Sequence, residues 1–241
     1  MNFIRAYLRF TRHYYYGLLL TLPVFILYEA GIWWLHNYSR FRVRNLIDVV
    51  VKYIIQHIGA SGFFSATIGI FMLMVLLLRP KRDLIIFRVK YIWIFIIESC
   101  FFALAFAVGM YYGEQLVMAV SAGLKNYISG VILSCGAGFY EELFFRVCCF
   151  GGLYYLAKRV FGIEATISWV IAAVVSSVIF SLAHFIGMVG DTFGWYPFFF
   201  RLIGGLYFCL IYYFRGFAVA VYAHAIYDIL LVFSLFNRQF G

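Results

Sequence analysis

The sequence contains very few charged residues for its length. Only 12% of its 241 residues are Asp, Glu, Lys or Arg, whereas soluble domains are typically about a quarter charged. Hydrophobic residues make up 66% of the chain and the mean hydropathy is +0.95, so too few polar groups are available to cover a water-exposed surface. These numbers exclude an ordinary soluble domain and predict an integral membrane protein in contact with the lipid bilayer.

Acidic residues and cysteine motifs are also scarce. Ten Asp and Glu stand against 19 Lys and Arg, which gives a net charge of +9. The basic residues lie between apolar runs rather than along one face, so they indicate membrane topology and we expect no nucleic-acid partner. The five cysteines lie in apolar segments without a Cys-x-x-Cys pair, which predicts no disulfide framework.

Apolar runs long enough to cross a bilayer recur along the chain, since a spanning helix needs roughly 20 such residues. We therefore expect an all-α polytopic membrane protein with seven transmembrane helices, or eight as the alternative. Between the first two runs, residues 43–58 place Asp48 and Lys52 among apolar residues at helical spacing, which predicts an amphipathic helix in the membrane interface. The runs lie at 14–35, 61–78, 91–112, 127–157, 165–187, 196–214 and 217–236.

Basic residues at the ends of these runs predict the orientation. Arg12 precedes the first run, Lys158 and Arg159 follow the fourth, and Arg215 follows the sixth, so all fall on one side if the crossings alternate. By the positive-inside rule we expect a cytoplasmic N-terminus in the cell (inner) membrane. The 14–35 run is too long for a signal peptide, so we expect the first helix to be retained.

Nine ionisable residues lie within or at the edge of the apolar runs, where a charge costs about 2.5–3.5 kcal/mol without a partner. Glu142 and Arg146 are four residues apart, which predicts an ion pair on one helix face, whereas Glu141 points elsewhere. Gly136 and Gly138 predict close approach of a neighbouring helix. The remaining intramembrane ionisable residues are Glu29, Glu98, His184, Arg201, His224 and Asp228.

Histidines on two later runs complete a candidate polar site. His184 follows Phe180 by four residues, and Asp228 follows His224 by four, which places the latter two on one helix face. An imidazole and a carboxylate can set each other's protonation and hold a water. We therefore expect these groups to meet Glu141 in one pocket.

Three motifs in this order resemble the CPBP family of intramembrane proteases. That family includes the type II CAAX prenyl endopeptidases and the bacteriocin-processing and bacteriocin-immunity (Abi) proteins. The resemblance covers residues 127–236, which it marks as a catalytic transmembrane core after an N-terminal transmembrane region, 1–126. The motifs are Glu141-Glu142 to Arg146, Phe180 to His184, and His224 to Asp228.

The resemblance implies a hydrolase, a CAAX-protease-like intramembrane endopeptidase that cleaves a membrane-associated protein or peptide. Glu141 would be the general base that activates a water, with His184 beside it. His224 and Asp228 would hold the water or stabilise the oxyanion. The structural support of the site would come from Glu142, Arg146 and Phe180.

Asp228 occupies a position where many relatives carry Asn. An amide can donate a hydrogen bond to an oxyanion, whereas an ionised carboxylate cannot. Asp228 can instead be protonated, orient His224 or help to bind a metal. We expect no cofactor, and the alternative is a zinc ion held by Glu141, His184 and His224 with an open position for water.

Other classes of protein remain alternatives. The segment Gly59-Ala60-Ser61-Gly62 matches the Gly-x-Ser-Gly sequence of rhomboid serine proteases, but that pattern does not account for Glu141, so we expect an ordinary helix start there. A proton-coupled carrier would also need buried charges, although the sequence lacks the repeated halves typical of carriers. A non-catalytic bacteriocin-immunity or binding protein would keep its biological effect after Glu141→Ala.

Overall fold

The computed structural model describes residues 3–38, 43–57, 67, 69, 71–72, 74–76, 89–118, 127–186 and 190–240, which contain helices and no strands. Six helical runs in this part of the chain are long and apolar enough to span a membrane. They match six of the seven predicted runs and confirm an all-α, multi-pass membrane protein, while the predicted run 61–78 lies mostly outside the described residues. The runs are α2 (Tyr14–Tyr38), α5 (Val89–Met118), α6 to η2 (Tyr127–Val160), α8 (Ala165–Ala183), α9 (Trp195–Arg215) and α10 (Phe217–Phe240).

The longest run is one continuous helix of 34 residues, Tyr127–Val160. The backbone stays in the right-handed helical region at the internal junctions, with φ −65° and ψ −45° at Gly136 and φ −62° and ψ −43° at Gly151. Its centre widens into π-type turns, a local geometry frequent at functional sites. The parts are α6 (Tyr127–Gly136), η1 (Ala137–Phe150), α7 (Gly151–Tyr155) and η2 (Leu156–Val160).

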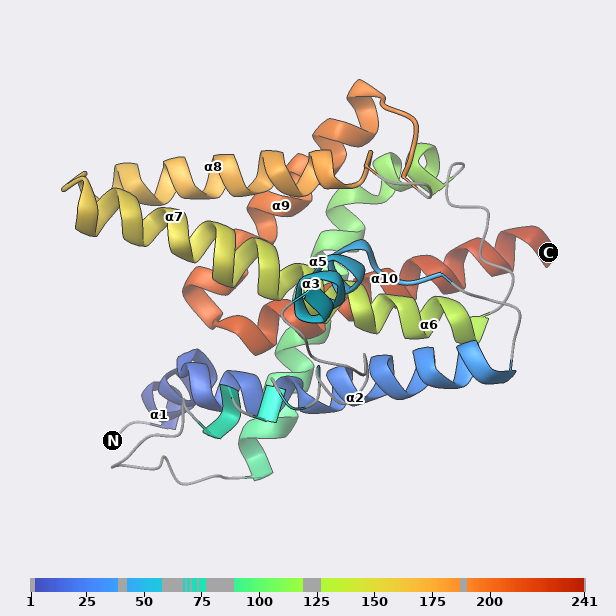
Figure 1. Ribbon diagram of the computed structural model, residues 1–241, viewed down its shortest axis with the longest axis horizontal. Helices are drawn as coiled ribbons and strands as arrows, with labels where there is room; N and C mark the ends of the chain where they lie inside the picture. The colour runs from blue at the N-terminus through green and yellow to red at the C-terminus, as the bar shows by residue number, and fades with distance from the viewer. Residues whose placement is uncertain are drawn as a thin grey trace.

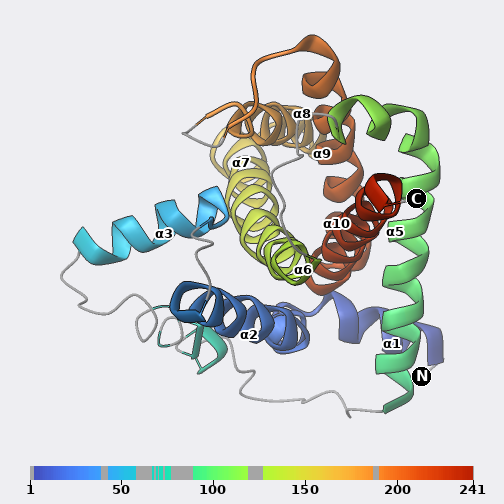
Figure 2. The ribbon, with the colours of Figure 1, turned by 90° about the vertical axis from the view of Figure 1, so that its right-hand side faces the viewer.

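Most of the long helices lie side by side along the long axis of the molecule. Helices α2, α6, α8 and α10 follow this axis, whereas α5 crosses α10 steeply (Figures 1 and 2). The two larger clusters of buried side chains in the core join α1 (Phe3–Arg12), α5, α9 and α10 in one case and α2, η1, α8 and α10 in the other. Helix α10 contributes to both clusters, so it is the central element of the bundle.

The predicted basic ends of the spans lie together at one end of the bundle. The start of α2, the end of η2 and the junction of α9 with α10 all lie on the left in Figure 1. Gly216 at that junction has φ +96°, and a Cβ built on it would lie 2.6 Å from the carbonyl oxygen of Thr11. Glycine is favoured here because the backbone is left-handed and the end of α1 approaches it closely.

Close helix packing around η1 confirms the role predicted for Gly136 and Gly138. A Cβ on Gly136 would lie 2.3 Å from the Tyr28 ring, and one on Gly138 would lie 2.7 Å from the Val221 carbonyl oxygen. These glycines let α2 and α10 contact the backbone of η1 directly, which brings residues on three helices within reach of one another.

Gly138→Ala is expected to lower the free energy of unfolding by about 1–3 kcal/mol, because its new methyl group must displace the backbone of α10. The measurement is denaturant unfolding of the purified protein in detergent. Gly152→Ala is the matched control on the same helix, since a Cβ there meets nothing within 4 Å. Equal stability of the two variants would contradict the close contact between η1 and α10.

Helix α3 (Leu46–His57) confirms the helix predicted for residues 43–58, but its polar face does not point to water. Asp48 and Lys52 are buried in the protein, while the apolar side chains of Val49 and Tyr53 are exposed. The interfacial orientation expected from the sequence assumed that the charged face would be solvated. Ion pairing with Glu29 of α2 turns that face inward instead.

Candidate active site

Glu141 and His184 face one another from two different helices. Glu141 lies on η1, and His184 directly follows the last turn of α8. The distance between His184 Nε2 and Glu141 Oε2 is 3.9 Å. That separation exceeds a direct hydrogen bond and suits a single water bridging the two groups.

The orientation of the His184 ring follows from its second nitrogen. Nδ1 lies 2.9 Å from the carbonyl oxygen of Phe180, which can only accept a hydrogen bond. Nδ1 therefore carries the proton of the neutral ring, and Nε2 presents a lone pair towards Glu141. The Phe180-x-x-x-His184 spacing makes this contact local, because four residues bring the side chain back over one helical turn.

His224 of α10 is held in the same way by Glu142. Its Nδ1 lies 2.7 Å from Glu142 Oε1, and its Nε2 lies 3.6 Å from Asp228 Oδ2. Because the carboxylate accepts, Nδ1 is the donor and Nε2 is the nitrogen left for a further partner. The sequence predicted the contact with Asp228 from spacing, whereas the contact with Glu142 joins residues 82 positions apart.

These four side chains form one electrostatically connected group. Glu141 interacts with both His224 and Asp228, and His184 interacts with His224. The side chains of His184 and Asp228 are 29% and 26% exposed, while that of His224 is 6% exposed. The structure thus brings together all four candidate catalytic residues from η1, α8 and α10, and the group is accessible from the side of His184 and Asp228.

The predicted pair of Glu142 and Arg146 is present and fully buried. Arg146 Nε lies 3.1 Å from Glu142 Oε2, and both side chains are 0% exposed. The guanidinium lies 4.5 Å from the centre of the Phe180 ring and 5.4 Å from that of Phe208, as in cation–π contacts. Phe208 also stacks on His224, with ring centres 4.6 Å apart. Arg146 therefore neutralises the carboxylate that holds His224.

The three charged residues that the sequence left without partners also have ion pairs. Glu29 binds Lys52 at 2.9 Å, Glu98 binds Arg215, and Arg201 binds Asp191. Each pair joins different elements of the chain, so spacing within one helix could not reveal it.

One residue at the site was missed by the sequence analysis. The side-chain amide of Asn45, just before α3, donates to Glu141 Oε1 at 2.6 Å. The two residues are 96 positions apart, and no motif connects them. Ser61, which carries the rhomboid alternative, lies outside the described residues.

The predicted zinc ligands do not form a metal-binding group. Among the side chains that the structure describes, no three His, Cys, Asp or Glu are placed to hold one ion. Nδ1 of each histidine already has a partner, Phe180 or Glu142, and the Nε2 atoms face different carboxylates. The described arrangement therefore offers no zinc-type set of ligands, and the choice between the water-only and the zinc version of the site stays a prediction.

The fold and the site together define a polytopic membrane protein with a carboxylate–histidine site shared by three helices. Residues 123–230 match the family described as Type II CAAX prenyl endopeptidase Rce1-like. This segment contains all three motifs, and the match supports the resemblance to the CPBP family of intramembrane proteases. Neither a curated protein nor a solved structure matches the chain.

Proposed function

We propose that the protein is an intramembrane endopeptidase that hydrolyses a peptide bond of a membrane-associated protein or peptide. The observation that supports this function is the 3.9 Å gap between His184 Nε2 and Glu141 Oε2, which suits a nucleophilic water. A carboxylate beside a neutral imidazole in a mostly buried site is a suitable base for that water. The matched family adds a prenylated C-terminal peptide as the first substrate class to test.

In the proposed reaction, Glu141 Oε2 takes a proton from the water as its oxygen attacks the carbonyl carbon. A C–O bond forms and the carbonyl oxygen becomes an oxyanion. Collapse of this intermediate breaks the C–N bond, and Glu141 returns the proton to the leaving nitrogen. His184 orients the water through Nε2.

His224 is the group that we assign to the oxyanion side. Its Nδ1 donates to Glu142. In the doubly protonated ring, which the carboxylates of Glu142 and Asp228 favour, Nε2–H is free to donate to the oxyanion. Asp228, 3.6 Å from this nitrogen, supports an orienting role rather than that of an oxyanion donor. Glu142, Arg146 and Phe180 hold the two histidines in place.

The test uses the purified protein in phospholipid vesicles and an internally quenched farnesylated peptide with a CAAX-type C-terminus. We expect cleavage, with one oxygen from ¹⁸O-labelled water in each new carboxylate. The same peptide without the prenyl group separates prenyl recognition from hydrolysis. If neither this peptide nor a membrane-spanning peptide is cleaved, hydrolysis is wrong and a carrier or binding role is the better hypothesis.

The orientation in the membrane is part of this proposal. The basic segments lie at one end of the bundle (Figure 1), and we assign that end and the N-terminus to the cytoplasmic face of the cell (inner) membrane. Single cysteines introduced at Arg9 and at Asn37 test the assignment by labelling. Both positions are exposed, and they lie shortly before the start of α2 and near its end. Labelling of the Arg9 position from the outside would reverse it.

Strong chelators are expected to leave the activity unchanged, because the described histidines and carboxylates form no metal-binding group. The measurement is the cleavage rate before and after dialysis against a chelator, together with the metal content by elemental analysis. Loss of activity that added zinc restores would instead support the metal-dependent alternative.

A further inference from the structure

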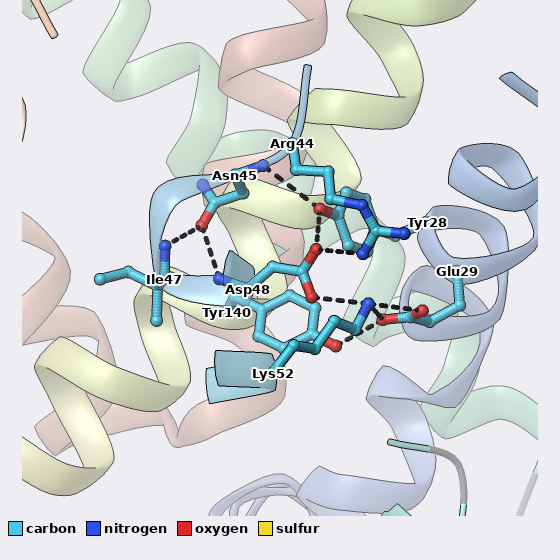
Figure 3. A network of polar contacts seen from close by, with 8 residues as sticks. All are labelled: Tyr28, Glu29, Arg44, Asn45, Ile47, Asp48, Lys52 and Tyr140. Atoms are coloured by element: carbon cyan, nitrogen blue, oxygen red, sulfur yellow. Dashed lines mark hydrogen bonds and ion pairs between the residues drawn. The ribbon is translucent and has the colours of Figure 1, made fainter. Parts of the chain in front are cut away.

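A chain of polar contacts joins α2, α3 and η1 (Figure 3). Tyr140 of η1 donates to Glu29, which pairs with Lys52 of α3 at 2.9 Å. Lys52 pairs in turn with Asp48 at 2.7 Å, and Asp48 accepts from the Tyr28 hydroxyl at 2.7 Å. The contacts thus fix the buried face of α3 on α2 and η1.

The chain returns to η1 through Asn45. The Tyr28 hydroxyl accepts from the backbone N–H of Asn45, and the Asn45 side chain reaches Glu141, the residue directly after Tyr140. Two acidic and two basic side chains, Glu29, Asp48, Lys52 and Arg44, balance one another within this network. The network is therefore electrically neutral without Glu141. The contact between Asn45 and Glu141 is a hydrogen bond from a neutral amide to a carboxylate that lies outside these ion pairs.

The orientation of the Asn45 amide is determined at both ends. Its Oδ1 accepts from the backbone N–H groups of Ile47 and Asp48, at 2.9 and 3.4 Å, and so caps the start of α3 (Figure 3). Its Nδ2 must then face the other way, towards Glu141 Oε1 at 2.6 Å. Flipping the amide would place an oxygen against the carboxylate and an NH₂ group against backbone donors, which excludes the reverse assignment.

We propose that Asn45 is a positioning residue, whose amide holds Glu141 Oε1 so that Oε2 alone faces His184 and the attacking water. This inference rests on the proposed function of Glu141 as the base. A carboxylate with both oxygens free can rotate about its last bond and present either oxygen in several directions. Anchoring one oxygen to a helix cap removes that freedom, and misplacement of a catalytic group by about 1 Å can cost on the order of 10²-fold in rate.

The cap of α3 and the contact with Glu141 can be separated by mutation. Asn45→Ser and Asn45→Asp both keep an oxygen that can cap α3. Neither has an amide to donate to Glu141, and Asp adds a second negative charge beside it. Asn37→Ser is the matched control, because Asn37 is an exposed asparagine whose amide contacts only the backbone of α2 among the described residues.

The first measurement is the cleavage of the farnesylated peptide by each variant, with thermal midpoints recorded in parallel. We expect kcat to fall about 10-fold in Asn45→Ser and about 10²-fold in Asn45→Asp, with KM and the thermal midpoint unchanged. Asn37→Ser keeps the wild-type kcat. In the double variant with Glu141→Gln, we expect Asn45→Ser to cause no further loss of kcat, because the two residues act as a unit. An unchanged kcat, or a fall in kcat that only follows the thermal midpoint, overturns the positioning role.

A second measurement does not depend on hydrolysis. The infrared difference between the wild type and Glu141→Gln isolates the Glu141 carboxylate band, and we expect Asn45→Ser to shift this band while Asn37→Ser does not. A protein that cleaves no peptide but shows the shift would refute the proposed function and leave the Asn45 contact established. A protein that cleaves the peptide without a shift or a change in kcat would refute the role of Asn45 alone.

Discussion

Replacing Glu141 with Gln is expected to slow peptide hydrolysis by about 10²–10⁴-fold, the usual contribution of a general base. The amide has nearly the same shape as the carboxylate and keeps an oxygen for the Asn45 contact, but it cannot take a proton from water. The expected loss is therefore in kcat, with little change in KM, because Glu141 acts on the water rather than on substrate binding.

The matched control for Glu141→Gln is Glu164→Gln. Glu164 is an exposed carboxylate that caps the start of α8, and hydrogen bonds from Thr166 and Ile167 lower its pKa. Glu164 lies outside the site, so Glu164→Gln should keep the wild-type rate of hydrolysis. Ser61→Ala should keep it as well. If Glu141→Gln kept the wild-type rate while Ser61→Ala lost it, a rhomboid-type serine mechanism would replace the glutamate one.

Replacing Arg146 with Met is expected to lower the free energy of unfolding by about 3–5 kcal/mol, the usual cost of leaving one member of a buried ion pair alone. Glu142 is fully buried and would remain without its cation, and the ring contacts with Phe180 and Phe208 would be lost. Because Glu142 also holds His224, any folded fraction should have a lower kcat.

A double variant shows whether the unpaired charge causes this loss. Glu142→Gln removes the negative charge and keeps an oxygen that can accept from His224, so Glu142→Gln with Arg146→Met should be more stable than Arg146→Met alone. Arg159→Met, an exposed arginine near the end of the same long helix, should leave the stability within about 0.5 kcal/mol of wild type. Equal losses in the single and double variants would contradict the ion-pair explanation. The measurement is denaturant unfolding in detergent.

Local spacing predicted the contacts that one helix can make by itself. Glu142 and Arg146, and His224 and Asp228, are each four residues apart, and both pairs face one another in the structure. The predicted orientation of α3 was wrong for a related reason. Its amphipathic pattern specifies two faces, but it does not specify whether the charged face meets water or the buried carboxylate of Glu29.

Composition and periodicity alone determined that this chain is a helical, multi-pass membrane protein, because a low charge content and long apolar runs leave the bilayer as the suitable solvent. The order of three motifs also indicated the resemblance to the CPBP family. Only the tertiary structure decided that Asn45 binds Glu141 and that Glu142 binds His224. These contacts join residues that are distant in the chain, and they form because glycines and small side chains let η1, α2 and α10 pack closely enough to bring the polar groups together.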